Sequence, residues 1–343
     1  MTDGSAAGIV VAINPREERL AHAIRFEKTG GPEVLAWQEV AIGKPAQGQV
    51  RLRHSAVGLN FIDTYQRSGL YALPLPSGLG SEAAGVVEEV GPGVSALKPG
   101  DRVAYAGGPI GAYADERVVP ADRLVPVPAG ITDQQAAAMM LKGMTAWYLV
   151  RRTHSVMRGE TILIHAAAGG VGLIACQWAK HLGATVIGTV GDDEKAALVK
   201  QHGCDHPIVY RREDFVARVA EITQGKKLPV VYDSVGKDTF YKSLECLAPL
   251  GLMVSFGQSS GAIGPVDIGI LAAKGSLFLT RPTLVNYTAT REDLLTASRE
   301  LFDVVQSGAV KIAINQTYPL REAARAHRDL EGRKTTGQTV LTV

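Results

Sequence analysis

Residues 161–180 read TILIHAAAGGVGLIACQWAK, a stretch in which an apolar run enters a glycine turn and leaves as a helical pattern. Gly169 and Gly170 let the backbone approach a phosphate closely, and Gly172 lets a helix pack against the preceding strand. The free N–H groups at the start of such a helix favour an anion. The stretch therefore predicts a turn that binds the pyrophosphate of a dinucleotide, with Ala167 in the place of the first glycine of the usual G-x-G-x-x-G pattern.

The next apolar run, residues 185–190, indicates which dinucleotide is bound. In enzymes that use NAD, the corresponding strand ends at an acidic residue that binds the ribose 2′-hydroxyl. Here the run ends at Val190, so no carboxylate at the strand tip repels a 2′-phosphate. The sequence therefore favours NADPH as the cofactor, and Asp192 and Asp193 count against it because they lower the positive potential nearby.

The segments around the glycine turn predict the fold class. A helical pattern at 194–202 is followed by apolar runs at 229–233, 251–256 and 276–280. Strands that alternate with helices are typical of an α/β protein with a doubly wound parallel sheet. A glycine turn by itself is also a plain packing device, but this alternation favours the cofactor-binding interpretation.

The first part of the chain has a different pattern. Short strands are predicted at 49–53, 84–88, 101–105 and 113–119, separated by glycine and proline, as in a small, partly barrel-like β domain. A helical stretch then leads into the glycine-turn region, and two further helical stretches and a last strand are expected to return to the N-terminal domain. These segments span 133–152, 291–307, 320–331 and 338–343.

Length and composition support two domains in a globular protein. The chain has 343 residues, of which 46% are hydrophobic and 20% charged. We expect a poorly ordered leader over 1–22, a catalytic domain from 23–145 and 282–343, and a cofactor domain over 146–281. The 36 basic residues are interspersed with 34 acidic ones, so a nucleic-acid partner is not expected.

Cell location is inferred from what the chain lacks. The apolar run at 8–13 is too short to span a bilayer, and no basic segment precedes it, so neither a membrane span nor a signal peptide is expected. The cysteines, Cys176, Cys204 and Cys246, are far apart in the sequence, as in reduced cytoplasmic proteins. We therefore expect a cytoplasmic protein, with Cys176 buried and inert.

Several motifs follow one another in a recognisable order. They are GLNFIDTYQRSGLY at 58–71, GLGSEAAG at 78–85, GDRV at 100–103, LKGMT at 141–145, the glycine turn, and DSVG at 233–236. In this order they resemble the medium-chain dehydrogenase/reductase superfamily, and most closely its zinc-free, zeta-crystallin-like NADPH:quinone oxidoreductases. The resemblance runs from residue 24 to the C-terminus. It implies a GroES-like catalytic domain, a Rossmann domain that binds NADPH, and an active site in the cleft between them.

The resemblance to this superfamily raises the question whether the chain binds zinc. Zinc alcohol dehydrogenases of this superfamily carry a cysteine near Asn60, a Gly-His-Glu in place of Gly80-Ser81-Glu82, and a cysteine-rich lobe near 105–115. The chain has none of these ligands, and a catalytic zinc needs about three Cys, His or carboxylate ligands. We therefore expect no metal, and Glu82 as a structural partner inside the fold.

The resemblance assigns cofactor contacts residue by residue. It implies that Lys195 and Tyr210 approach the 2′-phosphate, that Arg333 adds a further contact, and that Lys142 reaches the nicotinamide ribose. A cation and a hydroxyl suit a phosphate dianion. The alternatives are a solvated lysine at a helix start for both Lys195 and Lys142, and a surface tyrosine for Tyr210. The remaining predicted cofactor residues are Asn60, Thr145, Ala168, Gly169, Gly170, Val171, Ser234 and Phe256.

Four residues are the candidates for the chemical end of the site: Asn60, Tyr65, Tyr71 and Arg281. Hydride transfer to a quinone leaves negative charge on a ring oxygen, which hydrogen-bond donors stabilise. The alternative for the tyrosines is packing inside the cleft, and for Arg281 an ion pair between domains. His165 is interpreted as a core histidine.

The sequence is compatible with three functions. The first is NADPH-dependent reduction of small quinones, and the second is reduction of enones or 2-alkenals by an enzyme of the same superfamily. The third is an NADPH-binding structural or RNA-binding protein, which tight, salt-sensitive RNA binding in a filter assay would support. We also expect a homodimer through the strand at 276–280, because an open sheet edge invites pairing with its symmetry mate.

Overall fold

The glycine-turn stretch lies in a six-stranded parallel sheet in the computed structural model, which describes residues 19–343. The sheet order is β11-β10-β9-β12-β13-β14, so the chain starts in the middle, builds one half outward, and then builds the other. This is the order of dinucleotide-binding sheets. The strands are β9 (Thr161–Ile164), β10 (Thr185–Val190), β11 (His206–Val209), β12 (Leu228–Asp233), β13 (Leu247–Ser255) and β14 (Phe278–Thr280).

Helices cover both faces of this sheet. Ile162 and Ile164 of β9 belong to a buried cluster with residues of α3, whereas Leu163, which points to the other face, clusters with residues of α5 and α6. The sheet is therefore doubly wound, as predicted. Its helices are α3 (Gly170–His181), α4 (Asp193–Gln201), α5 (Phe215–Ile222), α6 (Phe240–Glu245) and α7 (Gly269–Ala273).

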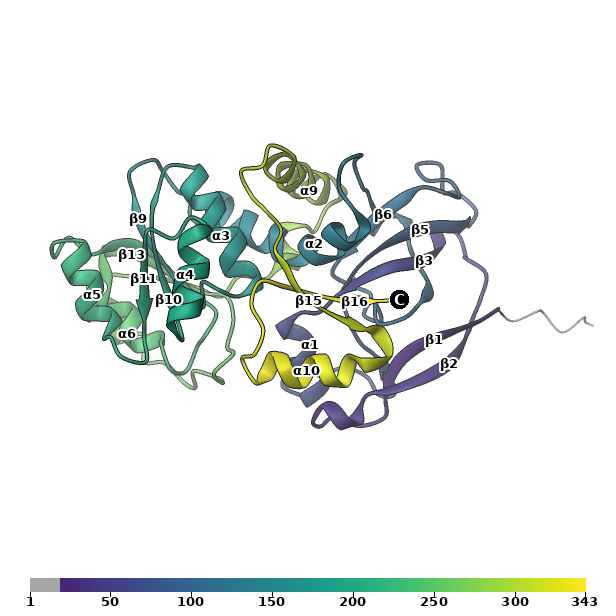
Figure 1. Ribbon diagram of the computed structural model, residues 1–343, viewed down its shortest axis with the longest axis horizontal. Helices are drawn as coiled ribbons and strands as arrows, with labels where there is room; N and C mark the ends of the chain where they lie inside the picture. The colour runs from purple at the N-terminus through teal and green to yellow at the C-terminus, as the bar shows by residue number, and fades with distance from the viewer. Residues whose placement is uncertain (1–18) are drawn as a thin grey trace, which may run out of the picture.

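The other half of the molecule is β-rich (Figure 1). A seven-stranded sheet has the order β15-β16-β3-β5-β6-β8, with β7 also paired to β3, and a small sheet has the order β2-β1-β4. The last strand, β16, pairs antiparallel with β3, so the C-terminal segment lies in this sheet. The strands are β1 (Arg19–Phe26), β2 (Ala36–Ile42), β3 (Gln49–Gly58), β4 (Ser77–Gly78), β5 (Glu82–Val90), β6 (Arg102–Ala106), β7 (Glu116–Pro120), β8 (Val125–Pro126), β15 (Ile314–Pro319) and β16 (Gln338–Thr342).

The beginning of the described chain differs from the expected leader. Strand β1 starts at Arg19, inside the range 1–22 that was expected to be poorly ordered. The Arg19 side chain donates to Glu116 at 2.6 Å, which ties the strand to β7. The expected leader overlaps β1 by four residues, and its part over 1–18 lies outside the described residues.

Helix α2 (Asp133–Tyr148) connects the two halves (Figure 1). Thr132 caps its start by accepting from the backbone N–H of Gln135. The predicted helix at 133–152 continues past Tyr148 as a π-helical turn, η3 (Leu149–Thr153). The remaining helices are η1 (Pro32–Val34), α1 (Phe61–Ser68), η2 (Ala121–Arg123), α8 (Leu284–Tyr287), α9 (Arg291–Gln306), η4 (Leu320–Glu322) and α10 (Ala323–Glu331).

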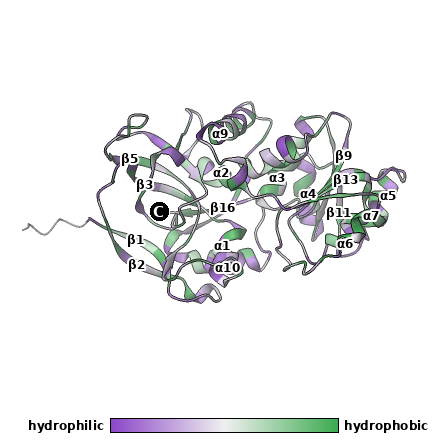
Figure 2. Ribbon diagram, turned by 180° about the vertical axis from the view of Figure 1, so that it is seen from behind, coloured by the Kyte–Doolittle hydropathy of each residue, from purple (hydrophilic) through white to green (hydrophobic). Residues whose placement is uncertain are grey.

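Helix α10 lies beside α1 and strands β15 and β16 (Figure 1). It carries both hydrophilic and hydrophobic residues (Figure 2), and it buries Ala323, Ala326 and His327. Of the helices in 19–343, none has the length and apolar character needed to cross a membrane.

Candidate active site

The start of helix α3 is suited to an anion. Its N-cap residue is Gly169, and no side chain caps the helix. By contrast, Thr132 and Asp192 accept from backbone N–H groups at the starts of α2 and α4. The first N–H groups of a helix have no partner within the helix. At α3 they therefore remain available to a phosphate, as the sequence pattern predicts.

The structure explains how the turn accommodates Ala167 in place of a glycine. A Cβ added to Gly188 of the neighbouring strand β10 would lie 2.8 Å from the Ala167 methyl carbon, so Gly188 leaves the space that this methyl fills. Gly172 has the predicted packing role, because its added Cβ would lie 2.5 Å from the carbonyl oxygen of Ala166. The glycine missing from the turn is thus compensated on the next strand.

Residues at the end of β10 form a cluster of donors. Lys195 Nζ donates to the carbonyl oxygen of Arg333 at 2.9 Å, which brings the segment after α10 to the start of α4. A Cβ added to Gly191 would lie 3.3 Å from the Tyr210 hydroxyl and 3.9 Å from Arg211 Nε, so these side chains lie over the strand end. Sequence reasoning missed Arg211, although it directly follows Tyr210.

Asp192 and Asp193, beside this cluster, have different partners. Asp193 accepts two hydrogen bonds from Arg212, at 2.6 and 2.5 Å, and this guanidinium holds the pKa of Asp193 below its usual value. Asp192 accepts from the backbone N–H of Lys195 at 2.8 Å and thereby caps α4. Arg212 thus neutralises Asp193, whereas the Asp192 carboxylate caps α4 and also lies 3.8 Å from Lys195 Nζ, so it offsets part of that positive charge.

Glu82 is the centre of a second cluster. It is fully buried, and it accepts from Asn60 Nδ2 at 2.8 Å, from Lys142 Nζ at 3.1 Å and from the backbone N–H of Leu141 at 2.7 Å. Lys142 balances its charge, so Glu82 has the structural role that was predicted. Lys142 lies in the second half of α2 and is buried, so the alternative of a solvated lysine at a helix start is wrong for it.

Three of the four candidates for the chemical end meet where two parallel strands finish, whereas Asn60 lies in the Glu82 cluster. Arg281 follows β14, and its Nη1 donates at 2.9 Å to the carbonyl oxygen of Ser255, the last residue of β13, and at 2.8 Å to that of Gly257. Its Nη2 donates to the Tyr71 hydroxyl at 3.1 Å. Over residues 19–343 no carboxylate pairs with Arg281, so the alternative of an interdomain ion pair is wrong.

Tyr65 lies beside Tyr71, with the ring centroids 5.2 Å apart. Its hydroxyl accepts from the backbone N–H of Gln258 at 3.1 Å. Burial raises the pKa of Tyr65 to about 12, so its phenol is protonated at neutral pH. Both tyrosine oxygens thus accept a hydrogen bond from the cofactor domain, through Gln258 and Arg281.

The other predicted site residues lie around these clusters. Thr145 is on α2 near Lys142, Ala168 and Val171 flank the start of α3, and Ser234 and Phe256 directly follow β12 and β13. His165 is a core histidine as predicted, since Thr189 and Ser243 hold its two ring nitrogens at 2.8 and 2.9 Å. Cys176 is buried, also as predicted.

Comparison with known proteins identifies the family. The chain is 56% identical to a quinone oxidoreductase of Pseudomonas aeruginosa over 323 residues, which is 94% of this chain and 99% of that protein. The Escherichia coli quinone oxidoreductase crystallised with NADPH superposes with a TM-score of 0.93 at 53% identity, over 94% of this chain and 100% of the other. The chain belongs to the quinone oxidoreductase family.

Family models agree with this position in the medium-chain dehydrogenase/reductase superfamily. Residues 46–129 match the alcohol dehydrogenase GroES-like domain, and residues 170–301 match the zinc-binding dehydrogenase family. A 2-haloacrylate reductase of Burkholderia is also related, at 49% identity over 92% of this chain and 97% of that protein. Despite the second family's name, no group of three or more His, Cys, Asp or Glu side chains in residues 19–343 is arranged to hold a metal.

Proposed function

We propose that the protein is an enzyme that reduces small quinones with NADPH. The support is the family, the uncapped start of α3, and the pair of tyrosines beside Arg281. When bound, NADPH supplies a hydride to the substrate. The side chains of this protein bind, orient and polarise, and no metal is required by the proposed reaction.

The residues at the end of β10 fit the adenosine end of NADPH. Lys195 supplies a positive charge, and Tyr210 supplies a hydroxyl, for the 2′-phosphate. Only 21% of the Lys195 side chain is exposed, and its hydrogen bond to Arg333 fixes its direction, which argues against a freely solvated lysine. We propose Arg333 as the C-terminal contact of the same subsite, and Arg211 as an additional cation there.

The observation that carries the proposal is the state of the two phenols. Each oxygen accepts one hydrogen bond, Tyr65 from Gln258 and Tyr71 from Arg281, so each hydroxyl keeps its own proton to donate. No acceptor for either proton is found in residues 19–343. Two donors next to an unpaired guanidinium suit an oxygen that gains negative charge, and this is the change that hydride transfer causes at a quinone.

Reduction of an α,β-unsaturated acid or ketone is the second candidate function. Two observations favour it: the relationship to a 2-haloacrylate reductase, and a guanidinium that no carboxylate of the described chain neutralises. A substrate carboxylate would pair with Arg281, whereas an uncharged quinone would only accept hydrogen bonds from it. The two functions therefore place different demands on Arg281.

The test is the loss of NADPH absorbance on adding 1,4-benzoquinone, 2-cyclohexenone or 2-chloroacrylate, run beside NADH and with a chelator. We expect chelator-resistant oxidation with benzoquinone and a strong preference for NADPH. Turnover of the enone or the haloacrylate alone would establish the second function. Binding of NADPH without turnover of any acceptor would contradict both.

Assembly and location are further proposals. Strand β14 is the edge of the parallel sheet, and its residues Phe278 and Leu279 are 60% and 38% exposed, which supports a homodimer through this edge. A monomer mass in light scattering at micromolar concentration would contradict it. The three free cysteines are consistent with the cytoplasm, which cell fractionation tests.

A further inference from the structure

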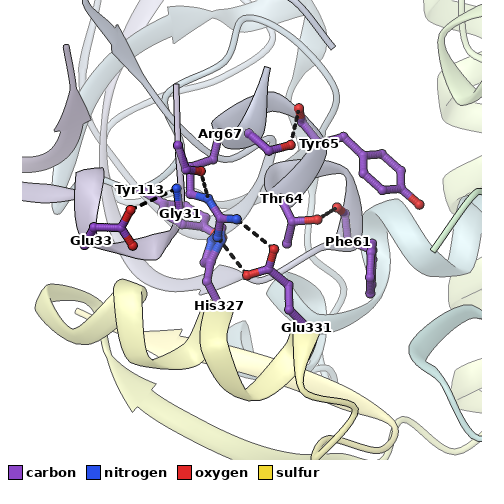
Figure 3. Close-up of polar contacts among 11 residues, drawn as sticks. Gly31, Glu33, Phe61, Thr64, Tyr65, Arg67, Tyr113, His327 and Glu331 are labelled. Carbon is purple, nitrogen blue, oxygen red and sulfur yellow. Dashed lines mark hydrogen bonds and ion pairs between the residues drawn. The ribbon is translucent and has the colours of Figure 1, made fainter. Parts of the chain in front are cut away.

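A chain of buried hydrogen bonds links helix α10 to the start of α1. Figure 3 shows the part of it around Arg67, His327 and Glu331. Arg67 Nη1 lies 3.1 Å from His327 Nδ1, and His327 Nε2 lies 3.1 Å from the Tyr113 hydroxyl. The Tyr113 hydroxyl donates to Asp63 Oδ2 at 2.8 Å. Asp63 Oδ2 also accepts from the backbone N–H of Asn60 at 2.9 Å. We call these contacts the Arg67–Asp63 chain.

Between Arg67 and Asp63, all hydrogen bonds of the chain have the same donor-to-acceptor direction, toward Asp63. A guanidinium only donates, so His327 Nδ1 accepts from Arg67, and the ring proton lies on Nε2. Burial and the nearby Arg67 charge lower the pKa of His327 to about 3, so the ring is neutral. Nε2 then donates to Tyr113, and Tyr113 donates to Asp63. Every donor has an acceptor, and the chain ends at a carboxylate.

The far end of the chain is firmly anchored. Arg67 forms a bidentate ion pair with Glu331, with distances of 3.0 and 2.7 Å, and its Nε donates to the carbonyl oxygen of Gly30 at 3.0 Å. Only 3% of the Arg67 side chain is exposed. Three fixed partners leave this guanidinium little freedom, so Arg67 ties α1, on which it lies together with Asp63, to α10.

The near end of the chain reaches the candidate active site. Asn60, whose N–H is held by Asp63, uses its side-chain amide to donate to Glu82, next to Lys142. Asn60 also precedes α1, the helix that carries Tyr65. Asp63 Oδ1 is buried without a partner in the described chain, so Asp63 acts entirely through Oδ2.

We infer that Asp63, Tyr113 and His327 are positioning residues for the substrate end of the site, where they hold Asn60 and the start of α1 in the arrangement that reduction requires. None of them touches the reacting atoms; each acts through the next. This inference rests on the proposed function and deepens it, because it assigns a role to buried groups that the reaction itself does not use.

The protonation of Asp63 should appear in the pH dependence of activity. Asp63 faces the Asn60 N–H and the Tyr113 hydroxyl, with Lys142 and Glu82 as the charges that act on it and Arg67 and His327 further along the chain. Burial outweighs these donors and raises the pKa of Asp63 to about 7. The carboxylate accepts both hydrogen bonds, and protonation weakens them. Activity is therefore expected to fall as the pH drops through this value.

The test compares the same substitution, tyrosine to phenylalanine, at two buried tyrosines. Tyr113→Phe removes the hydroxyl from the chain. Tyr105→Phe removes an equivalent hydroxyl, which lies 3.1 Å from Nε2 of the buried His54 in the same domain and has no link to Asn60. Each variant loses a buried tyrosine–histidine hydrogen bond and one further hydrogen bond, from Tyr113 to Asp63 at 2.8 Å or from Arg117 to Tyr105 at 3.4 Å. They should differ at the active site.

For Tyr113→Phe we expect kcat with benzoquinone to fall about tenfold, with NADPH affinity unchanged and the acid limb of kcat moved to higher pH. Tyr105→Phe should keep the wild-type kcat and pH profile. Equal kcat values in the two variants, or an unmoved acid limb in Tyr113→Phe, would overturn the inference. If Tyr113→Phe does not fold, Asp63→Asn replaces it, and its acid limb should be absent.

A second readout does not depend on turnover. The side-chain amide signal of Asn60 in ¹⁵N NMR, assigned with Asn60→Asp, should move in Tyr113→Phe and stay in place in Tyr105→Phe. A signal that stays in place in both variants would overturn the positioning role. A wild-type protein that turns over no acceptor would instead contradict the proposed function, and the NMR result would still decide this inference.

Discussion

The Arg281 guanidinium donates to the Tyr71 hydroxyl at 3.1 Å, although 210 positions separate the two residues in the chain. One nitrogen of Arg281 is held by carbonyl oxygens at the end of β13 and just after it, and the other reaches the catalytic-domain side. The contact joins the end of the parallel sheet to the segment after α1. It gives Arg281 an orientation that no ion pair in the described chain provides.

Replacing Arg281 with lysine should therefore impair substrate reduction. An ammonium group cannot bond the carbonyl oxygens and Tyr71 in the same planar arrangement. We expect kcat/KM with benzoquinone to fall at least about tenfold, with little change in NADPH affinity. The control is Arg291→Lys, since Arg291 also donates to two carbonyl oxygens, of Asp122 and Leu124, away from the site. Equal losses in both variants would refute a role in reduction.

Lys195 should determine the preference for NADPH. Lys195→Ala removes a positive charge from the end of β10, so we expect KM for NADPH to rise about 10- to 100-fold while KM for NADH stays the same. Lys200→Ala, on the same helix, should leave both values unchanged. Steady-state kinetics with each cofactor checks this, and an equal effect on NADH would show that Lys195 does not contact the 2′-phosphate.

Asp193, after β10, should have little effect on NADPH affinity despite its negative charge. Because Arg212 neutralises Asp193, we expect Asp193→Asn to change NADPH affinity by less than about twofold. Arg212→Gln leaves the Asp193 carboxylate unpaired, and it should weaken NADPH binding, most of all at low salt. Titration of NADPH fluorescence at two ionic strengths measures both effects. Tighter binding by Asp193→Asn would contradict the neutralised pair.

Asp63 should make folding stability depend on pH. Burial raises its pKa from the ordinary value of 3.8 to about 7, so the folded state holds this proton more tightly than the unfolded state. The corresponding stability is full below pH 3.8 and is lost as pH rises through about 7. Relative to wild type, Asp63→Asn should gain stability on the order of a few kcal/mol over this interval. Urea unfolding at several pH values tests it, and parallel curves for the two proteins would contradict it.

Gly172 should resist substitution by alanine. Its added Cβ would lie 2.5 and 2.6 Å from the carbonyl oxygens of Ala166 and Ala167, which are backbone atoms that cannot rotate away. We expect Gly172→Ala to cost about 1–3 kcal/mol of unfolding free energy and to weaken NADPH binding. Gly43→Ala, with open space around the added carbon, is the control. Equal stability of the two variants would show that the turn can widen.

Sequence reasoning located the glycine turn at the start of α3, but it could not place every partner of the predicted site residues. The position of Glu82 between Asn60 and Lys142 was expected only in outline, because a buried carboxylate takes its partners from whichever elements the fold brings near. Arg211 was missed because a basic residue beside Tyr210 has no sequence pattern of its own. The N-terminal boundary also differed: β1 begins at Arg19, whose partner Glu116 is 97 positions away.

The sequence by itself determined the doubly wound sheet and the glycine turn, because strand and helix periodicity and glycine placement are local properties of the chain. Only the tertiary structure decided which side chains meet. The Arg67–Glu331 pair joins residues 264 positions apart, and its geometry depends on how α10 packs beside α1. Such contacts follow from burial and charge after the chain has folded, and no local pattern encodes them.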